Sequence, residues 1–167
     1  SIRNARNNRV TVYSSKIPTR FSASSSSSIY TDETIKANKI SVDVSSSAKI
    51  SLKKLIADDI NLSTSSSSKL TTDVSSKNLQ VSASSSSKQE IAGSASNLNL
   101  NTNSSASVDM SRFSTTNAQV QANSSANVTL SVKENLQGNV STSARIALKN
   151  QPKNVQVDKS TSGRVVL

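Results

Sequence analysis

The stretch Ile40-Ser-Val42-Asp-Val44-Ser-Ser-Ser-Ala-Lys-Ile50 decides the fold of this chain. An alternation of apolar and polar residues runs into a knot of serines and leaves it on another apolar residue. This motif occurs eight times. We use the residue just after each group of serines as the marker of its repeat: Ile29, Ile50, Leu70, Gln89, Val108, Val128, Ile146 and Val165. These markers lie 18 to 21 residues apart. Self-similarity at a period near 20 residues is typical of solenoid proteins, in which successive turns stack.

The bulk composition alone is typical of a disordered segment. Serine fills 40 of the 167 positions, and only 33% of the residues are hydrophobic. A disordered segment has no reason to place Ile, Val and Leu at alternate positions once in every repeat, whereas a stacked coil requires it. The periodicity therefore predicts a folded rod with a thin core.

Each repeat contains three short apolar stretches. Alternate apolar residues before the knot, such as those of residues 40–44, predict a strand that is buried on one face only. A second stretch starts at the marker, as in residues 50–52, and a third column follows at Ile35, Leu55, Val74, Phe113 and Val132. We therefore expect an all-β fold, a single-stranded parallel β-helix of about eight turns with a roughly triangular cross-section. The handedness rule for parallel connections favours a right-handed coil. We expect residues 1–16 to form an N-terminal cap region with a strand that leads into the repeats, and residues 17–167 to form the solenoid.

Two polar columns are expected to support the stack. One position in the knot is serine in every copy, and we interpret it as a structural serine ladder: Ser26, Ser47, Ser67, Ser86, Ser105, Ser125, Ser143 and Ser162. We expect a tight corner there, whose hydroxyls bond backbone groups that the bend leaves unpaired. The other column is expected to form an amide ladder along the outside: Asn61, Gln80, Asn99, Gln119, Gln137 and Gln156. Gln89 stands at an inward position, which indicates either a buried amide or a local bulge.

A net charge of +10 favours anionic partners. The outward column just before the marker carries lysine on three consecutive turns, and further lysines lie nearby, so the candidate anion-binding stripe is Lys49, Lys69, Lys88, Lys53, Lys54 and Lys77. Its ligand would be an anionic glycan or another cell-surface polymer. The alternative is a solvated face whose charges are relieved by Glu90 and Asp109. Nucleic acid is disfavoured because stacking aromatic residues are missing.

The residue types limit catalysis. The chain has no histidine and no cysteine, which excludes imidazole and thiolate chemistry. Carboxylates remain as acid and base groups. Asp58 and Asp59 share a corner, and Glu90 and Asp109 share an outward column on consecutive turns, so a polysaccharide-active enzyme is the third alternative. Neither pair lies beside an aromatic residue that could stack on a sugar, and we expect no enzyme activity, no cofactor and no metal.

The segment Val44-Ser-Ser-Ser-Ala-Lys-Ile50-Ser-Leu52, followed by Ile56-Ala-Asp-Asp-Ile60-Asn-Leu62-Ser, resembles the repeat of the bacterial head GIN domain family, a family of adhesin-like proteins. The resemblance runs from about Arg9 to Leu167. It implies a secreted or outer-membrane-anchored protein with an adhesin role and without established catalytic residues. Ser46, Ser66 and Ser85 stand where the family often has glycine. A larger N-terminal segment that members commonly carry is not found ahead of the repeats.

The last repeat, residues 157–167, stops on an apolar strand without a polar cap. Uncapped parallel edges favour end-to-end stacking with a second copy. No apolar run of 18 residues and no signal-type segment is found in the sequence. We therefore expect a non-enzymatic, exported structural or adhesin-like module, secreted or held at a bacterial cell surface or in the periplasm.

Overall fold

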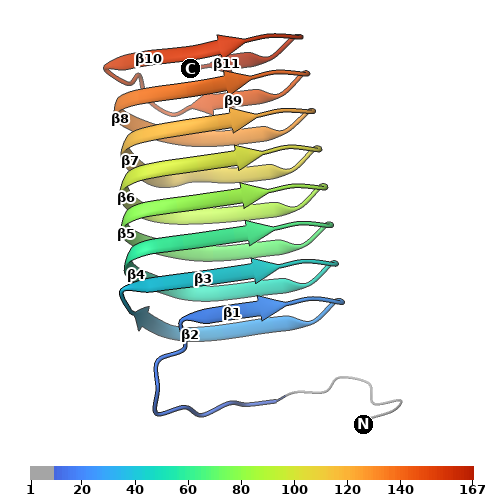
Figure 1. Ribbon diagram of the computed structural model, residues 1–167, viewed down its shortest axis with the longest axis vertical. Helices are drawn as coiled ribbons and strands as arrows, with labels where there is room; N and C mark the ends of the chain where they lie inside the picture. The colour runs from blue at the N-terminus through green and yellow to red at the C-terminus, as the bar shows by residue number, and fades with distance from the viewer. Residues whose placement is uncertain (1–9) are drawn as a thin grey trace.

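The computed structural model describes residues 10–167 as one parallel β-sheet coiled into a solenoid (Figure 1). The described part contains no helix. Its strands are β1 (Arg20–Ala23), β2 (Ser28–Lys36), β3 (Lys39–Val44), β4 (Lys49–Thr64), β5 (Lys69–Ala83), β6 (Lys88–Thr102), β7 (Ser107–Ala122), β8 (Asn127–Val140), β9 (Arg145–Leu148), β10 (Asn154–Lys159) and β11 (Arg164–Val166). The expected all-β parallel solenoid is confirmed.

Each turn has two long faces. The front face, nearest the viewer in Figure 1, includes β3 and the C-terminal parts of β4 to β8, and the return face begins at the residue before each marker. Eight serine turns join front to return faces, which confirms the expected number of turns. As the chain climbs, it runs to the right along the front strands and comes back to the left behind them (Figure 1). The coil is therefore right-handed.

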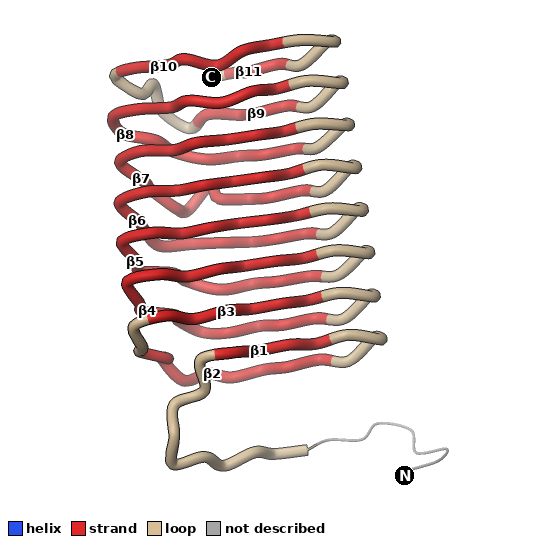
Figure 2. Tube along the Cα trace, in the orientation of Figure 1, coloured by secondary structure: helices blue, strands red, loops and turns tan. Residues whose placement is uncertain are grey.

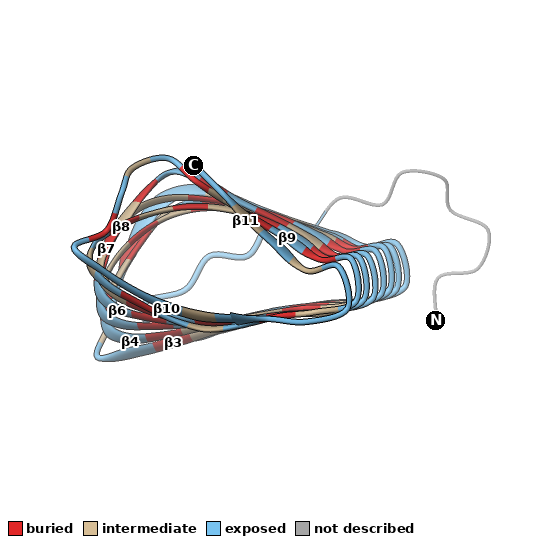
Figure 3. Cartoon of the chain, turned by 90° about the horizontal axis from the view of Figure 1, so that it is seen from above, coloured by how far each residue is buried: buried red, intermediate tan, exposed pale blue. Residues whose placement is uncertain are grey.

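Seen along its axis, the rod is a wedge (Figure 3). The front and return faces converge at the serine turns, and a short third side closes the wide end. Between β4 and β8 loops lie only at the narrow edge, because these strands continue around the wide corner; at the two ends of the rod, loops also lie at the wide side and in the segment before β1 (Figure 2). This outline agrees with the expected triangular cross-section.

The expected apolar columns form the core. Ile40, Ile60 and Leu79 stack in register on the front face, and all three are buried. The third column is also buried, from Ile35 at 5% exposure to Phe113 at 2%. Aromatic residues are so few that Ile, Leu, Val and Ala fill nearly the whole interior. Burial of such side chains contributes about 1.5–3 kcal/mol each for the larger ones, which is why a chain so rich in serine folds.

Differences in repeat length are absorbed on only part of each turn. The front faces pair without interruption, whereas register shifts occur later, between Leu52 and Lys54 and between Glu90 and Ala92, for example. β-bulges of this kind let one strand carry extra residues without breaking the neighbouring pairs. The front face and the serine turn therefore keep a constant spacing from turn to turn.

Two sequence expectations need comment here. Gln89 is inward and 1% exposed, in register between Leu70 and Val108 with no shift at that point, so the alternative of a bulge at this residue is wrong. Of the expected cap region, residues 1–9 lie outside the described part. Residues 10–16 carry no strand and are exposed, and the first strand begins at Arg20.

Candidate functional site

The narrow edge of the wedge is built from left-handed backbone. In every turn two consecutive residues have positive φ, for example Ser46 at 50° and Ser47 at 62°. The second of these positions is the serine column of the sequence: Ser26, Ser47, Ser67, Ser86, Ser105, Ser125, Ser143 and Ser162. A hydrogen bond closes each turn, such as the one from the Ala48 N–H to the Ser45 carbonyl at 3.0 Å. Two central residues with positive φ characterise the tight turns that match the twist of neighbouring strands.

Backbone groups hold the serine turns together. The N–H of each second residue donates to the carbonyl of the first residue in the next turn, as from Ser47 to Ser66 at 2.9 Å. Side chains at both positions are exposed, and in the described part their hydroxyls make no hydrogen bond to the protein. The expectation that these hydroxyls bond the backbone is therefore wrong. Serines one position later do so, since Ser68 donates to the Val44 carbonyl at 2.9 Å.

The structure divides the six predicted lysines into separate groups. Lys49, Lys69 and Lys88 stack in register at the start of the return face, beside the serine edge. Lys53 and Lys54 lie farther along the return face. Lys77 lies at the wide corner, eight residues beyond Lys69, which corresponds to roughly 25 Å along a strand. We call Lys49, Lys69 and Lys88 the lysine column.

Carboxylates on neighbouring turns already engage half of these six lysines. Lys69 Nζ lies 2.6 Å from Glu90, Lys77 Nζ lies 3.0 Å from Asp58, and Lys54 Nζ lies 3.6 Å from Asp73. No ion pair is formed by Lys49, Lys53 or Lys88 within the described residues. Exposed ion pairs contribute about 0–1 kcal/mol, so an incoming polyanion can displace them.

Carboxylates are the candidate acid and base groups of the chain. Glu90 and Asp109 are in register on consecutive turns, as the sequence indicated. The pKa of Asp109 is lowered from its ordinary value of 3.8, because the Ser111 backbone N–H donates to its Oδ1 at 2.9 Å. A general acid needs the opposite shift. Within residues 10–167 no three acidic residues gather as metal ligands.

An amide ladder runs along the front face, but in a different column from the expected one. Each asparagine donates through Nδ2 to Oδ1 of the residue one turn below, at distances from 2.7 to 3.1 Å. The ladder consists of Asn154, Asn135, Asn117, Asn97 and Asn78 and ends on Asp59. The expected column of Asn61, Gln80, Asn99, Gln119, Gln137 and Gln156 makes no hydrogen bond among the described residues. Unequal side-chain lengths separate the amides from Asn61 to Gln119, but the consecutive glutamines Gln119, Gln137 and Gln156 are equal in length and also form no ladder.

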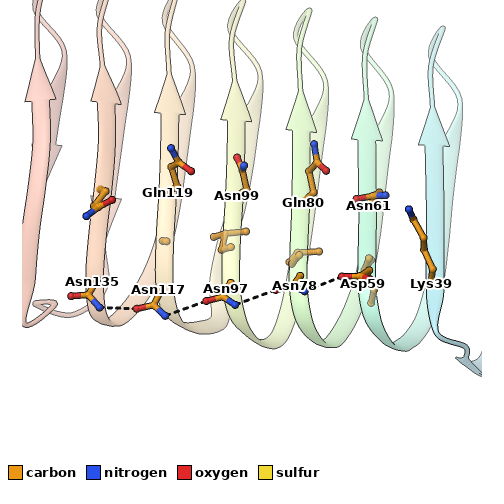
Figure 4. A pocket seen from close by; sticks show the side chains of 15 residues that line it. Lys39, Asp59, Asn61, Asn78, Gln80, Asn97, Asn99, Asn117, Gln119 and Asn135 are labelled. Atoms are coloured by element: carbon orange, nitrogen blue, oxygen red, sulfur yellow. Dashed lines mark hydrogen bonds between the residues drawn. The ribbon is translucent and has the colours of Figure 1, made fainter.

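These two columns border a shallow groove of about 720 Å³ that follows the axis of the rod. Figure 4 shows the ladder from Asp59 to Asn135 on one side and Asn61, Gln80, Asn99 and Gln119 on the other. We call the second set, together with Gln137, the free amide row. The floor of the groove is the strand backbone at positions such as Leu79 and Leu98. The sequence showed both columns, but their separation by a groove follows only from the stacked register.

Comparison with known proteins identifies a family for the chain. The family described as "Putative auto-transporter adhesin, head GIN domain" matches residues 1–72 and 41–152. No curated protein and no solved structure matches the chain. Across residues 10–167 no helix is long and apolar enough to cross a membrane. The two matches together cover most of the 167 residues, and the chain belongs to the head GIN domain family of adhesin-like proteins.

Proposed function

We propose that the protein is a non-enzymatic, exported structural module of a bacterial cell surface, which acts as an adhesin. Membership of an adhesin-like family supports this proposal. The observation that carries it is the stacked register, in which each outer column repeats one kind of side chain from turn to turn. A rigid rod of this type presents many copies of one weak contact, and many weak contacts in a fixed array bind strongly together.

The state of the carboxylates supports a role without catalysis. Asp58 and Glu90 are tied to lysines, and Asp59 accepts a hydrogen bond from Asn78 at 2.9 Å. The Ser111 backbone N–H, which donates to Asp109, holds the pKa of that carboxyl below its ordinary value. Glycoside hydrolysis requires one carboxyl group that stays protonated near neutral pH.

Adhesion is tested with beads that carry the purified chain. Under flow, these beads are expected to be retained on surfaces coated with mucin or heparin more often than beads coated with albumin. Retention that does not exceed the albumin level on either surface would overturn the adhesive role. Heat-unfolded protein on the same beads controls for charge, since it keeps the composition and loses the columns.

End-to-end stacking is a part of this proposal that has its own support. The last turn, β10 and β11, has an unpaired edge, where Val155 is 51% exposed and Leu167 is 75% exposed. At the other end β1 has an unpaired edge with the same strand direction. A second copy could therefore continue the sheet in parallel, because unpaired edges are templates for pairing.

Light scattering with size-exclusion chromatography tests the stacking. The chain is expected to form oligomers as its concentration rises, and Val155→Lys is expected to keep it monomeric. Gln156→Lys is the matched control, because it adds the same charge to an outward position of the same strand. A strict monomer at high concentration, or equal disruption by both variants, would refute the stacking.

Polyanion binding by the lysine column is a second candidate function. Three stacked lysines about 4.8 Å apart repel one another by roughly 1 kcal/mol per neighbouring pair in water, and a bound anion offsets this repulsion. Lys49 and Lys88 have no carboxylate partner among the described residues. These two lysines are the ones to change, since removing Lys69 would also release Glu90.

Heparin titrations at several salt concentrations test this candidate. The double variant Lys49→Gln and Lys88→Gln is expected to weaken binding and to flatten its dependence on salt, because fewer counterions are released. A control with Lys149→Gln and Lys159→Gln removes the same charge elsewhere on the rod. Equal effects of the two double variants would show that net charge alone attracts heparin and would exclude the column.

A further inference from the structure

The groove on the front face is electrically neutral in a strongly basic protein. Its lining contains one cation, Lys39, and one anion, Asp59, which lie in register on adjacent turns at the N-terminal end of the groove. All other polar side chains in the lining are amides. The chain as a whole carries a charge of +10, so this surface is set apart from the lysine column. The lining therefore adds no net electrostatic attraction for a polyanion, and it imposes no electrostatic penalty on an uncharged ligand.

Hydrogen-bonding capacity remains on both walls. An amide has two N–H donors and two acceptor lone pairs. A middle rung such as Asn97 uses one donor toward Asn78 and one acceptor toward Asn117. One N–H and one lone pair of each middle rung therefore stay available. Gln80 and Gln119, in the free amide row, bond to no other described residue and are exposed. Every turn thus offers donors and acceptors together, which suits a ligand whose groups are themselves both donors and acceptors.

The spacing of these groups selects the shape of the ligand. Successive turns place equivalent amides about 4.8 Å apart along a straight line. The front face carries no register shift, so this spacing is uninterrupted along the groove. An extended peptide would present side chains of one face about 6.8 Å apart, which does not match the rungs. The rings of an extended β-1,4-linked pyranose chain follow one another at a spacing close to one turn of the rod. Each ring is turned over relative to the one before it, so neighbouring rungs meet opposite edges of the sugar, and amides that both donate and accept suit either edge.

We infer that this groove is a binding site for an uncharged, extended β-1,4-linked polysaccharide that lies parallel to the solenoid axis with one sugar ring per turn. Ring hydroxyls, which donate and accept, would pair with the Asn ladder on one side and the free amide row on the other. The floor is strand backbone, so no aromatic stacking contributes, and each sugar is bound weakly. Affinity therefore accumulates with the number of rungs engaged. The inference rests on the proposed adhesive role and gives that role a ligand class and a face.

Titration calorimetry and NMR titration with three uncharged probes test the inference: cellohexaose, mannohexaose and N-acetylated chitohexaose. At least one is expected to bind, with an affinity that is unchanged between low and high salt. For that sugar series, affinity is expected to rise with chain length and to level off at about five rings, because the free amide row has five members. Failure of all three hexasaccharides to bind overturns the inference, and so does an affinity that does not increase with length.

Gln119 and Gln121 provide a matched pair of variants. Both are exposed glutamines of β7, two residues apart, and only Gln119 lines the groove. Gln119→Ala is expected to weaken the binding of the hexasaccharide about fivefold, the equivalent of one lost neutral hydrogen bond, and Gln121→Ala is expected to leave it unchanged. An equal loss in both variants, or no loss in either, overturns the site.

The outcome is distinguishable from failure of the proposed function. If beads adhere to mucin or heparin but the hexasaccharides do not bind, the adhesive role stands and the groove is excluded. If the hexasaccharides bind and the beads are retained neither on mucin or heparin nor on a surface coated with the polysaccharide that binds, the groove stands as a binding site and the adhesive role is lost.

Discussion

Replacing the left-handed serines of one turn by glycine is expected to stabilise the rod. Ser66 and Ser67 have φ values of 54° and 59°. A residue with a Cβ atom pays about 1–2 kcal/mol for this conformation, and glycine does not. Glycine costs about 0.5–1 kcal/mol more than other residues in chain entropy on folding. The double variant Ser66→Gly and Ser67→Gly should therefore gain about 1–2 kcal/mol, which corresponds to a Tm about 2–8 °C higher for a chain of this length.

Thermal unfolding followed by circular dichroism measures this effect, and two controls assign its cause. Ser65→Gly, one position earlier, changes a residue that does not have positive φ, so only the entropic cost remains and the Tm should fall by about 1–4 °C. Ser66→Ala with Ser67→Ala removes the hydroxyls but keeps the Cβ atoms. The Tm should then change by no more than about 2 °C, because these hydroxyls bond no described residue.

The reasoning would be refuted if the double glycine variant lost as much stability as Ser65→Gly. Backbone strain would then be negligible at these turns, and the serines would be retained for another reason. A large loss in the double alanine variant would refute it differently. It would show that the exposed hydroxyls themselves stabilise the edge, through ordered water for example.

Three further predictions concern other positions. Gly93 has a φ of 103°, and a Cβ atom there would lie 2.0 Å from the Val74 carbonyl oxygen, so Gly93→Ala should lower the free energy of unfolding by about 2–4 kcal/mol in thermal or urea unfolding. The buried Gln89 leaves its Oε1 without a partner, but its Nε2 donates two hydrogen bonds, so Gln89→Leu should lower the free energy of unfolding by about 1–3 kcal/mol in the same assay, and Gln89→Ala should lose about 2 kcal/mol more to a cavity. Asp109 has a folded pKa below its ordinary value of 3.8, so it contributes stability above that pH and loses it as the pH falls through the folded value. Asp109→Asn should therefore reduce the loss of Tm below about pH 4, and an unchanged profile would contradict the assignment.

The solenoid could be predicted from the sequence because each core column needs an apolar residue in nearly every turn. Ile40, Ile60 and Leu79 show this directly, since each lies on the next in the structure. The column of Leu70 and Val108 contains one polar residue, Gln89. This residue stays in register with its neighbours, and its amide is buried in the interior. The Nε2 of Gln89 donates to the Thr64 hydroxyl at 2.9 Å and to the Ser82 carbonyl at 2.7 Å. A polar residue in an inward column was therefore no evidence of a bulge.

The serine turns show where sequence reasoning stops. Glycine and asparagine usually indicate left-handed residues, whereas serine in this conformation is uncommon. The column of Ser26, Ser47 and Ser67 indicated a corner but not its backbone conformation. The expected hydroxyl bonds were inferred from what serine commonly does in turns, while here the backbone pairs between turns and the side chains face outward.

The amide ladder illustrates a second limit. Both the column of Asn78 and the column of Gln80 are polar and regular in sequence, so composition did not distinguish them. The structure does: the column of Asn78 contains only asparagine from there to Asn154, and the short side chains reach one another, whereas Gln119, Gln137 and Gln156 are in register and form no ladder. For the lysines, the sequence indicated Glu90 and Asp109 as neutralising residues, and the structure shows that of these two only Glu90 forms an ion pair among the described residues. The pairing of Lys69 with Glu90 joins different columns of consecutive turns.

The front face suits a regular polymer better than the return face, because its register is uninterrupted from turn to turn. Repeats of unequal length must place their extra residues somewhere, and here the register shifts lie on the return face, as between Leu52 and Lys54, and at the wide corner, between Thr115 and Asn117. A ligand that lay across such a bulge would lose its match with the rungs after one or two turns. The front face and the serine edge are spared, so columns there keep one spacing over the whole stack. The lysine column shares this regularity over only three turns, whereas the free amide row of the groove extends over five. Since affinity in a periodic site grows with the number of rungs in register, the groove can use the repeat more fully than the lysine column.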